Sequence, residues 1–267
     1  MNLRLTLAPV TSALLSLCSA VCQQTSNPPQ SPPPSGWSKS GYVVAFGATE
    51  SNAEGKAALA RLLQALGGPA KVNSVKSLHQ TVSAVQQGAR VDVDQSIVYP
   101  DQQSQRLTMP EGKRMTLVVT PRDAFMILGG QVQDLPSTQR TSLDSALKHD
   151  PVNVLQHIND PKYIFTATGR ETVDGVDATV VDIEADGVPT RWWIASDGKL
   201  MRERAAGEGG KIQTFVYSQW KSFDGLQYPT RYEVLSEGGM PVLSMTLTTM
   251  QVNPPINPKL FQRPASN

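Results

Sequence analysis

RWWIASDGKLMRER, residues 191–204, is the stretch that decides the fold, because two strand-forming runs flank an Asp-Gly turn. A two-residue Asp-Gly connection between such runs is a strong signal for a β-hairpin. The first run places Trp192 directly before Trp193, and neighbouring residues of a strand point to opposite faces of the sheet. If one tryptophan lies in the core, the other must face water or a second apolar surface.

The same pattern continues on both sides of this hairpin. Seven predicted strands in the C-terminal part are separated mostly by Asp-Gly or Gly-Gly pairs: 163–168, 178–184, 190–195, 199–205, 212–220, 228–236 and 242–251. Earlier runs with a period of two predict the strands 78–87, 90–99, 105–110, 114–120 and 124–129. The sequence therefore predicts a mainly antiparallel α+β fold of about 11 or 12 strands, too many for a flat open sheet, which should curl toward a barrel.

Two segments have helical periodicity instead. The first, residues 56–66, ends before Gly67-Gly68-Pro69 and carries a leucine stripe of Leu59, Leu62, Leu63 and Leu66. The second, residues 137–159, is divided by Pro151 into two short helices. We expect these helices to cover the concave face of the curled sheet, with the leucine stripe forming a lid helix. An exposed partner-binding surface is the alternative for the leucine stripe.

Residues 1–22 have the layout of a secretory signal peptide, with Arg4 near the start, a moderately apolar stretch and small residues at the end. We predict cleavage after Cys22, with lipidation of Cys22 or Cys18 as the alternative. The valine or leucine before each cysteine is a poor match to a lipoprotein signal. The chain is thus expected to be exported, most simply to the periplasm, and attachment to the outer membrane through Cys22 is the second possibility.

The rest of the chain divides into a tether and one domain. Residues 23–53 carry five closely spaced prolines near their start and predict an extended, disordered tether. Residues 54–267 form the predicted folded domain. Cleavage of the signal would remove Arg4 and leave 23 basic and 23 acidic residues. Such a neutral chain lacks the clustered positive charge that nucleic-acid binding requires, so no nucleic-acid partner is expected.

No chemical motif in the sequence predicts catalysis. The three histidines, His79, His149 and His157, do not have metal-ligand spacing, and no nucleotide-binding glycine pattern or serine-nucleophile motif is present. The aspartates of the 174–186 region are better explained as turn residues than as calcium ligands. We therefore predict a protein that is not an enzyme and that has no metal and no cofactor.

The second strand series is apolar on both faces. Simple alternation predicts Trp192 and Ile194 on one face, and Trp193 together with Phe215 and Tyr217 on the other. Because a sheet with one wet face should alternate cleanly, the second apolar face must be covered by helices, a partner or an apolar ligand. The candidate cavity residues are Trp192, Trp193, Phe215, Tyr217, Leu243, Met245 and Leu247. The alternative is that the protein's own helices fill this space.

This layout resembles the LolA-like and LolB-like outer-membrane lipoprotein-sorting proteins. The resemblance spans roughly residues 54–264 and rests on the leading helix, the mid-chain helical segment, the 191–202 and 215–229 stretches, and the tail from Asn253 to Pro264. It implies an incomplete β-barrel whose open side is covered by helices and whose cavity takes acyl chains. Its implied partners are lipid or lipoprotein acyl chains and a membrane-anchored donor or acceptor protein. A non-catalytic interaction module with a filled cavity is the alternative function.

Overall fold

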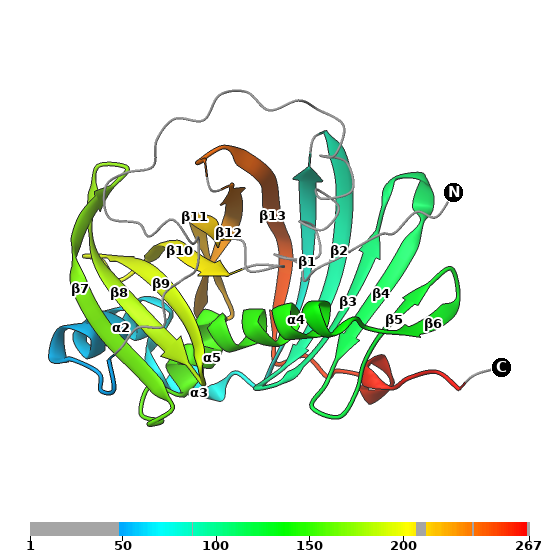
Figure 1. Ribbon diagram of the computed structural model, residues 1–267, viewed down its shortest axis with the longest axis horizontal. Coiled ribbons are helices and arrows are strands. Elements are labelled where there is room, and N and C mark those ends of the chain that lie inside the picture. The colour runs from blue at the N-terminus through cyan, green and yellow to red at the C-terminus, as the bar shows by residue number, and fades with distance from the viewer. Residues whose placement is uncertain (1–47, 87, 207–211, 237, 266–267) are drawn as a thin grey trace.

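The computed structural model describes residues 48–86, 88–206, 212–236 and 238–265. The predicted signal peptide, residues 1–22, and the predicted tether as far as residue 47 lie outside these ranges. Within them, a single 13-stranded sheet curls around one long helix, and its two edge strands do not pair with each other (Figure 1). The predicted α+β class and the curled, incomplete barrel are confirmed.

The sheet is antiparallel throughout, in the order β6-β5-β4-β3-β2-β1-β13-β12-β11-β10-β9-β8-β7. Its strands are β1 Ser77–Gln86, β2 Ala89–Val98, β3 Gln102–Thr108, β4 Arg114–Val119, β5 Ala124–Leu128, β6 Gln131–Asp134, β7 Tyr163–Val173, β8 Val176–Ala185, β9 Val188–Ala195, β10 Leu200–Ala206, β11 Ile212–Phe223, β12 Leu226–Leu235 and β13 Pro241–Val252. The strand that the sequence did not predict is β6, whose four residues include no fully buried side chain.

The Asp-Gly pairs form the tight turns that their chemistry predicts. At the β8–β9 turn, Asp186 and Gly187 both have positive φ, of 47° and 79°. Aspartate and glycine tolerate this left-handed region better than other residues, and such turns match the twist of a hairpin. Each short turn fixes the register of its two strands, which explains why the second strand series was read well from the sequence.

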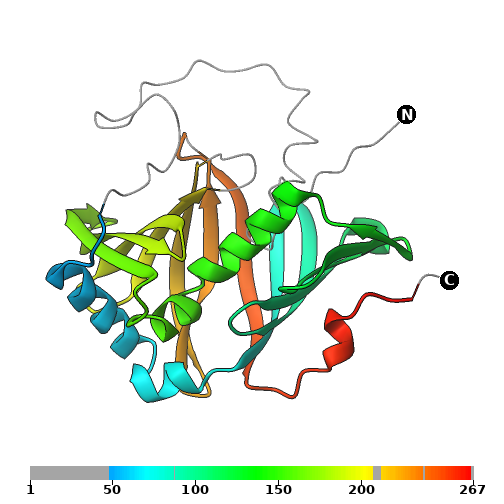
Figure 2. The same cartoon turned by 60° about the horizontal axis from the view of Figure 1, so that its bottom comes forward.

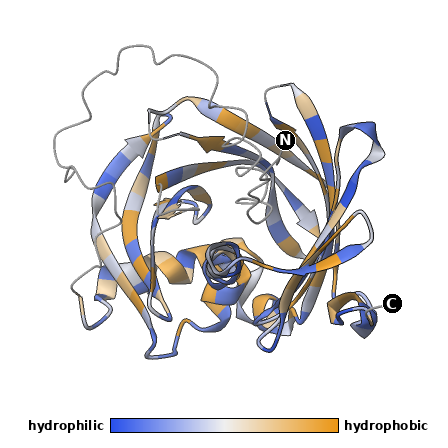
Figure 3. Cartoon of the chain, turned by 45° about the vertical axis from the view of Figure 1, so that its right-hand side comes forward, coloured by the Kyte–Doolittle hydropathy of each residue, from blue (hydrophilic) through white to orange (hydrophobic). Residues whose placement is uncertain are grey.

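In the described ranges, four α-helices accompany the sheet: α2 Ala53–Ala65, α3 Gly68–Ser74, α4 Ser137–His149 and α5 Pro151–Gln156. Figure 3 looks nearly along α4 and shows the sheet curled around this helix. Figure 2 shows α2 and α3 at one end of the molecule, where α2 contacts β7 and β8. The second helical segment divides at Pro151, as predicted. Beyond residue 66, however, the chain resumes as α3, because Pro69 is tolerated in a first helical turn.

Close backbone contacts fix α2 against the sheet. Asn52 caps the helix by accepting a hydrogen bond from the Gly55 amide at 2.7 Å, and its amide nitrogen donates to the carbonyl of Ala167 at 3.0 Å. A β-carbon on Gly198, in the turn that follows the tryptophan pair, would lie 2.5 Å from the Arg61 carbonyl oxygen. The Asp197-Gly198 turn therefore requires glycine both for its φ of 87° and for helix packing.

The adjacent tryptophans lie on opposite faces of the sheet, as predicted. Trp192 is fully buried in the main core on the concave side, whereas Trp193 belongs to a separate buried cluster with Val173, Ala178 and Val180. The prediction that Trp193 shares a face with Phe215 was wrong. Trp192 pairs with Glu203, and Glu203 pairs with Phe215. A register shift between Leu200 and Arg202 causes the difference, because a one-residue slip reverses the faces.

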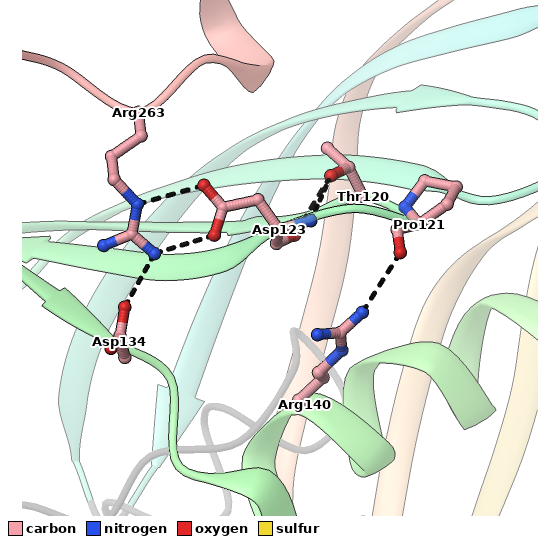
Figure 4. Close-up of polar contacts among 6 residues, drawn as sticks. All are labelled: Thr120, Pro121, Asp123, Asp134, Arg140 and Arg263. Carbon is pink, nitrogen blue, oxygen red and sulfur yellow. Dashed lines mark hydrogen bonds and ion pairs between the residues drawn. The ribbon is translucent and has the colours of Figure 1, made fainter.

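The C-terminal tail packs against β3 and β4 through a short 3-10 helix, η4 Pro258–Phe261. Beyond it, the Arg263 guanidinium pairs with Asp123 at 2.7 and 3.0 Å and with Asp134 at 2.7 Å (Figure 4). It also lies 5.0 Å from the centre of the Phe125 ring. These contacts hold the end of the described chain against the half of the sheet that contains β4 to β6.

Candidate ligand cavity

A cavity of about 140 Å³ lies between α4 and the concave face of the sheet. Its walls come from β1, β2 and β3 on one side, from β10, β11 and β12 on the other, and from α4 above. Its apolar lining includes Val82, Ile97, Leu147, Leu200, Phe215 and Met245. Typical small-molecule sites are about 300 to 1,000 Å³, so this cavity is too small for a long acyl chain unless α4 moves.

The structure brings together only part of the predicted site. Of the candidate residues, Phe215, Tyr217 and Met245 line the cavity. Trp192, Leu243 and Leu247 are buried in the main core behind these side chains, and Trp193 lies in the separate cluster on the other face.

The helix predicted as a lid lies elsewhere. Leu59 and Leu62 pack into the core, Leu63 is partly buried against it, and only Leu66 reaches the cavity wall. The element that lies over the cavity is α4, in the middle of the chain.

A row of buried glutamines forms one wall, which the sequence reading missed. The strand register places Gln80 opposite Gln95, and Gln95 opposite Gln105. Gln80 donates to Gln95 at 3.0 Å, and Gln95 donates to Gln103 at 3.3 Å. Gln105 also donates to Gln103, at 3.0 Å. These residues could have been found as polar positions recurring on the inward face of three consecutive predicted strands.

The direction of this hydrogen-bond network is fixed at its α4 end. The Gln103 amide nitrogen donates to the backbone carbonyl of Leu143 at 2.9 Å, and a carbonyl can only accept. The Gln103 oxygen must therefore accept from both Gln95 and Gln105. Gln105 uses its amide nitrogen in this bond, which leaves its carboxamide oxygen buried and without a hydrogen-bond partner. On the opposite wall, the side-chain oxygen of Gln213 is also buried without a partner.

The opposite wall carries a buried acid in an otherwise apolar row. Glu203 lies between Trp192 and Phe215 across the strands, and Tyr217 and Thr190 donate hydrogen bonds to its carboxyl oxygens. Burial raises the pKa of Glu203 to about 7, from an ordinary value of 4.5, because an apolar environment disfavours the charged form.

His149, at the end of α4, approaches the Glu203 carboxyl at 3.8 Å. Burial lowers its pKa from 6.5 to about 4. At neutral pH the imidazole is uncharged, so its contact with Glu203 is not an ion pair. The cavity therefore holds a neutral base and an acid that readily binds a proton.

A second buried acid anchors the junction of α4 and α5. Asp150 accepts hydrogen bonds from the hydroxyls of Tyr99 at 2.8 Å and Tyr228 at 3.1 Å. It also caps α5 by accepting from the backbone amides of Val152 and Asn153. Burial raises the pKa of the Asp150 carboxyl. Tyr228 belongs to β12 and Tyr99 to the turn between β2 and β3, so this cluster fixes the C-terminal end of α4.

Exposed and half-exposed polar contacts hold α4 near both ends. Near its N-terminus, Arg140 donates to the carbonyl of Pro121 at 3.3 Å (Figure 4). Near its C-terminus, Lys148 pairs with Asp186 of the β8–β9 turn at 2.8 Å. Half-exposed ion pairs are weak, which makes these contacts easier to break than the buried ones.

The lining of the site offers hydrogen bonding and apolar contact. Among the described residues, no group of three or more histidine, cysteine, aspartate or glutamate side chains is placed to hold a metal ion. Over the same part of the chain, no helix is both long and apolar enough to span a bilayer.

By sequence, the chain matches no protein-family model and no curated protein. By structure, it resembles a DUF1329 family protein from Desulfovibrio piger, with a TM-score of 0.55 and 12% identity over 78% of this chain and 97% of that one. It also resembles an outer membrane lipoprotein-sorting protein domain from Vibrio parahaemolyticus, with a TM-score of 0.53 and 11% identity over 78% of this chain and 96% of that one. A LolA superfamily protein from Nitrosomonas europaea is similar as well, with a TM-score of 0.53 and 12% identity over 78% of this chain and 97% of that one. The chain therefore has the LolA-like fold.

Proposed function

We propose that this protein is an exported, non-catalytic binding protein that holds lipid or lipoprotein acyl chains between α4 and the concave face of its sheet. The observation that carries the proposal is the cavity under α4, whose walls include Phe215, Leu200 and Met245. An acyl chain entering this space would remove apolar surface from water, at about 25 cal/mol per Å². The LolA-like fold and the lipoprotein-sorting description of one similar structure support this ligand class.

Loading requires α4 to move, because a cavity of about 140 Å³ is too small for a long chain. The weak Arg140 and Lys148 contacts would open first, and the Asp150 cluster would act as the hinge. A ligand that binds the open form better than the closed form would shift the population toward it. We further propose that residues 1–22 direct export to the periplasm and that a membrane-anchored donor or acceptor protein drives the opening of α4. The protein would then serve in lipoprotein sorting to the outer membrane.

The small volume of the cavity favours a second candidate function. If the glutamine network and α4 permanently fill the space, the protein is an interaction module that binds no lipid. The bond between Gln103 and the Leu143 carbonyl favours this alternative, because it ties α4 directly to the sheet.

Filling the cavity distinguishes the two candidates. Ala146 lines the cavity from α4, whereas Thr141 is exposed on the same helix. The chain from residue 23 onward, produced without lipid and titrated with a fluorescent acyl probe, is expected to bind the probe. Ala146→Trp should weaken this binding by about tenfold or more, and Thr141→Trp should leave it unchanged. Absence of probe binding, together with no lipid detected by native mass spectrometry after purification from the periplasm, would contradict the carrier function.

A further inference from the structure

We propose that the cavity selects amphiphiles whose polar part is uncharged and donates hydrogen bonds, such as acylglycerols or N-acyl amides, over anionic lipids. This inference rests on the proposed function and specifies the chemistry of its ligand. Its basis is the pair of unpartnered glutamine oxygens and the charge of the cavity walls.

The first observation is the orientation of the glutamine network. The Gln103 amide nitrogen donates to the Leu143 carbonyl, so the Gln103 oxygen faces Gln105. The Gln105 amide nitrogen therefore donates to that oxygen. The remaining Gln105 oxygen is a hydrogen-bond acceptor on a side chain that is only 1% exposed. An unpaired buried acceptor is costly, and only a donor can satisfy it. Reversing the Gln105 amide would place two oxygens against each other.

The second observation lies on the facing wall. Gln213 of β11 is 9% exposed, lines the same cavity and also has a buried side-chain oxygen without a partner. Strands β3 and β11 are far apart in the strand order, so the two glutamines approach the cavity from opposite halves of the curled sheet. A ligand with O–H or N–H groups near the end of its chain would satisfy acceptors that the protein itself leaves unpaired.

The third observation is the charge of the walls. The titratable side chains of the lining, apart from tyrosines, are His149, Asp150 and Glu203, and no described lysine or arginine lines the cavity. His149 is uncharged at neutral pH, so no cation in the lining would compensate a buried carboxylate or phosphate. Burying an unpaired charge is unfavourable, and two nearby acids would repel an anion further. A neutral donor fits these walls better than an anionic head group.

Four probes with the same twelve-carbon chain test this preference by displacement of a fluorescent acyl probe. They are dodecanoylglycerol, which donates through hydroxyls, dodecanamide, which donates through N–H, methyl dodecanoate, which is neutral but donates nothing, and the dodecanoate anion. We expect dodecanoylglycerol or dodecanamide to bind about tenfold more tightly than the ester, a difference equivalent to about 1.4 kcal/mol. The anion should bind no better than the ester. Tight binding of only one donor probe supports the inference and identifies the donor.

Two variants tie the preference to the unpaired oxygens. Gln105→Leu and Gln213→Leu should each reduce the advantage of the donor probe over the ester by about threefold or more while leaving the affinity for the ester within about twofold. Gln251→Leu, at an exposed position of β13, is the control and should change neither value. If Gln105→Leu does not fold, the inference is still tested by Gln213→Leu and by the order of the four probe affinities in the wild type.

The outcomes separate this inference from the function on which it rests. Equal binding of the ester and both donor probes, tighter binding of the anion, or an unchanged preference in both variants would overturn the donor inference while leaving acyl-chain binding intact. Failure of all four probes to bind would overturn the proposed function as well.

Discussion

The two halves of the curled sheet each carry a row of buried side chains on the same concave face, and the two rows differ in chemistry. In the β1–β3 half, the inward row consists of Gln80, Gln95 and Gln105, which are satisfied largely through one another and through α4. In the β9–β13 half, the inward row runs from Trp192 through Phe215 to Leu243 and is interrupted by one acid, Glu203. The glutamine row adds directional hydrogen bonds to a wall that is otherwise apolar, with Val82 and Ile97 beside it, whereas the second row is stabilised mainly by packing. We call these parts the polar half and the apolar half. A change should have different consequences in each half.

The largest expected effect is in the apolar half. Trp192→Ala removes a fully buried side chain from the main core and should lower the free energy of unfolding by about 3 to 5 kcal/mol. The matched variant Trp193→Ala, in the smaller cluster on the other face, should cost less and should leave acyl-probe binding unchanged. Urea unfolding of both variants checks this order. A larger loss for Trp193→Ala would show that the convex cluster, not the concave core, holds this half together.

The next largest effect is in the polar half. Gln103→Leu removes the residue at the centre of the network, with its bond to the Leu143 carbonyl, and leaves the amide nitrogens of Gln95 and Gln105 without partners. The Leu143 carbonyl keeps its bond within α4, so the cost comes mainly from the two glutamine amides. Because each unsatisfied buried group costs about 1 to 3 kcal/mol, we expect a loss of roughly 3 kcal/mol. The measurement is urea unfolding, with the exposed Gln251→Leu as the control.

Replacing the network as a whole sharpens this test. The combined change of Gln80, Gln95, Gln103 and Gln105 to leucine should cost less than the sum of the single changes, because few unpaired partners would remain. Additive losses would show that the glutamines act independently rather than as one network.

Glu203 should make the stability of the apolar half depend on pH. The pKa of Glu203 is raised from 4.5 to about 7 in the folded state, so the stability that its protonated form contributes is present below pH 4.5 and lost as the pH rises through about 7. Glu203→Gln should therefore unfold at a higher urea concentration than the wild type at pH 8 and at a similar one at pH 5. A pKa unit corresponds to about 1.4 kcal/mol, so the gain at pH 8 should be on the order of 1 to 3 kcal/mol.

The neighbouring imidazole of His149 gives stability the opposite pH dependence. The pKa of His149 is lowered from 6.5 to about 4, so the stability that its neutral form contributes is present above pH 6.5 and lost as the pH falls through about 4. His149→Gln should reduce this loss at acidic pH.

If the difference between Glu203→Gln and the wild type is the same at pH 5 and pH 8, the raised pKa of Glu203 is contradicted.

The smallest expected effect on stability is at the edge of α4. Lys148→Met breaks the half-exposed pair with Asp186 and should cost less than about 1 kcal/mol. Because this contact holds α4 over the cavity, release of a bound acyl probe should nevertheless become faster, which stopped-flow fluorescence can measure. Lys199→Met breaks a pair of the same length with Asp197 in the β9–β10 turn and should leave the release rate unchanged. Equal release rates in all three proteins would show that this contact does not limit opening.

Local sequence predicted most of the elements. The Asp-Gly pairs located the hairpins of the second strand series, because a tight turn depends on the residues within it. The leucine spacing of residues 56–66 and the position of Pro151 located the main helices for the same reason. The short edge strand β6 and the helix α3 were missed, since neither has a long enough periodic pattern to stand out from a loop.

The sequence by itself determined an antiparallel sheet that curls, two helical segments and a tryptophan pair divided between two faces. The tertiary structure alone decided which tryptophan points inward, because a register shift between Leu200 and Arg202 reverses the pairing expected from simple alternation. It also decided that α4, and not α2, lies over the cavity. The glutamine wall arises from residues of three separate strands, whose hydrogen bonds depend on register and on the position of a helix that follows about 40 residues later, as between Gln103 and Leu143. Periodicity predicts which residues prefer burial, whereas the long-range pairing of strands and helices determines which side chains they contact in the core.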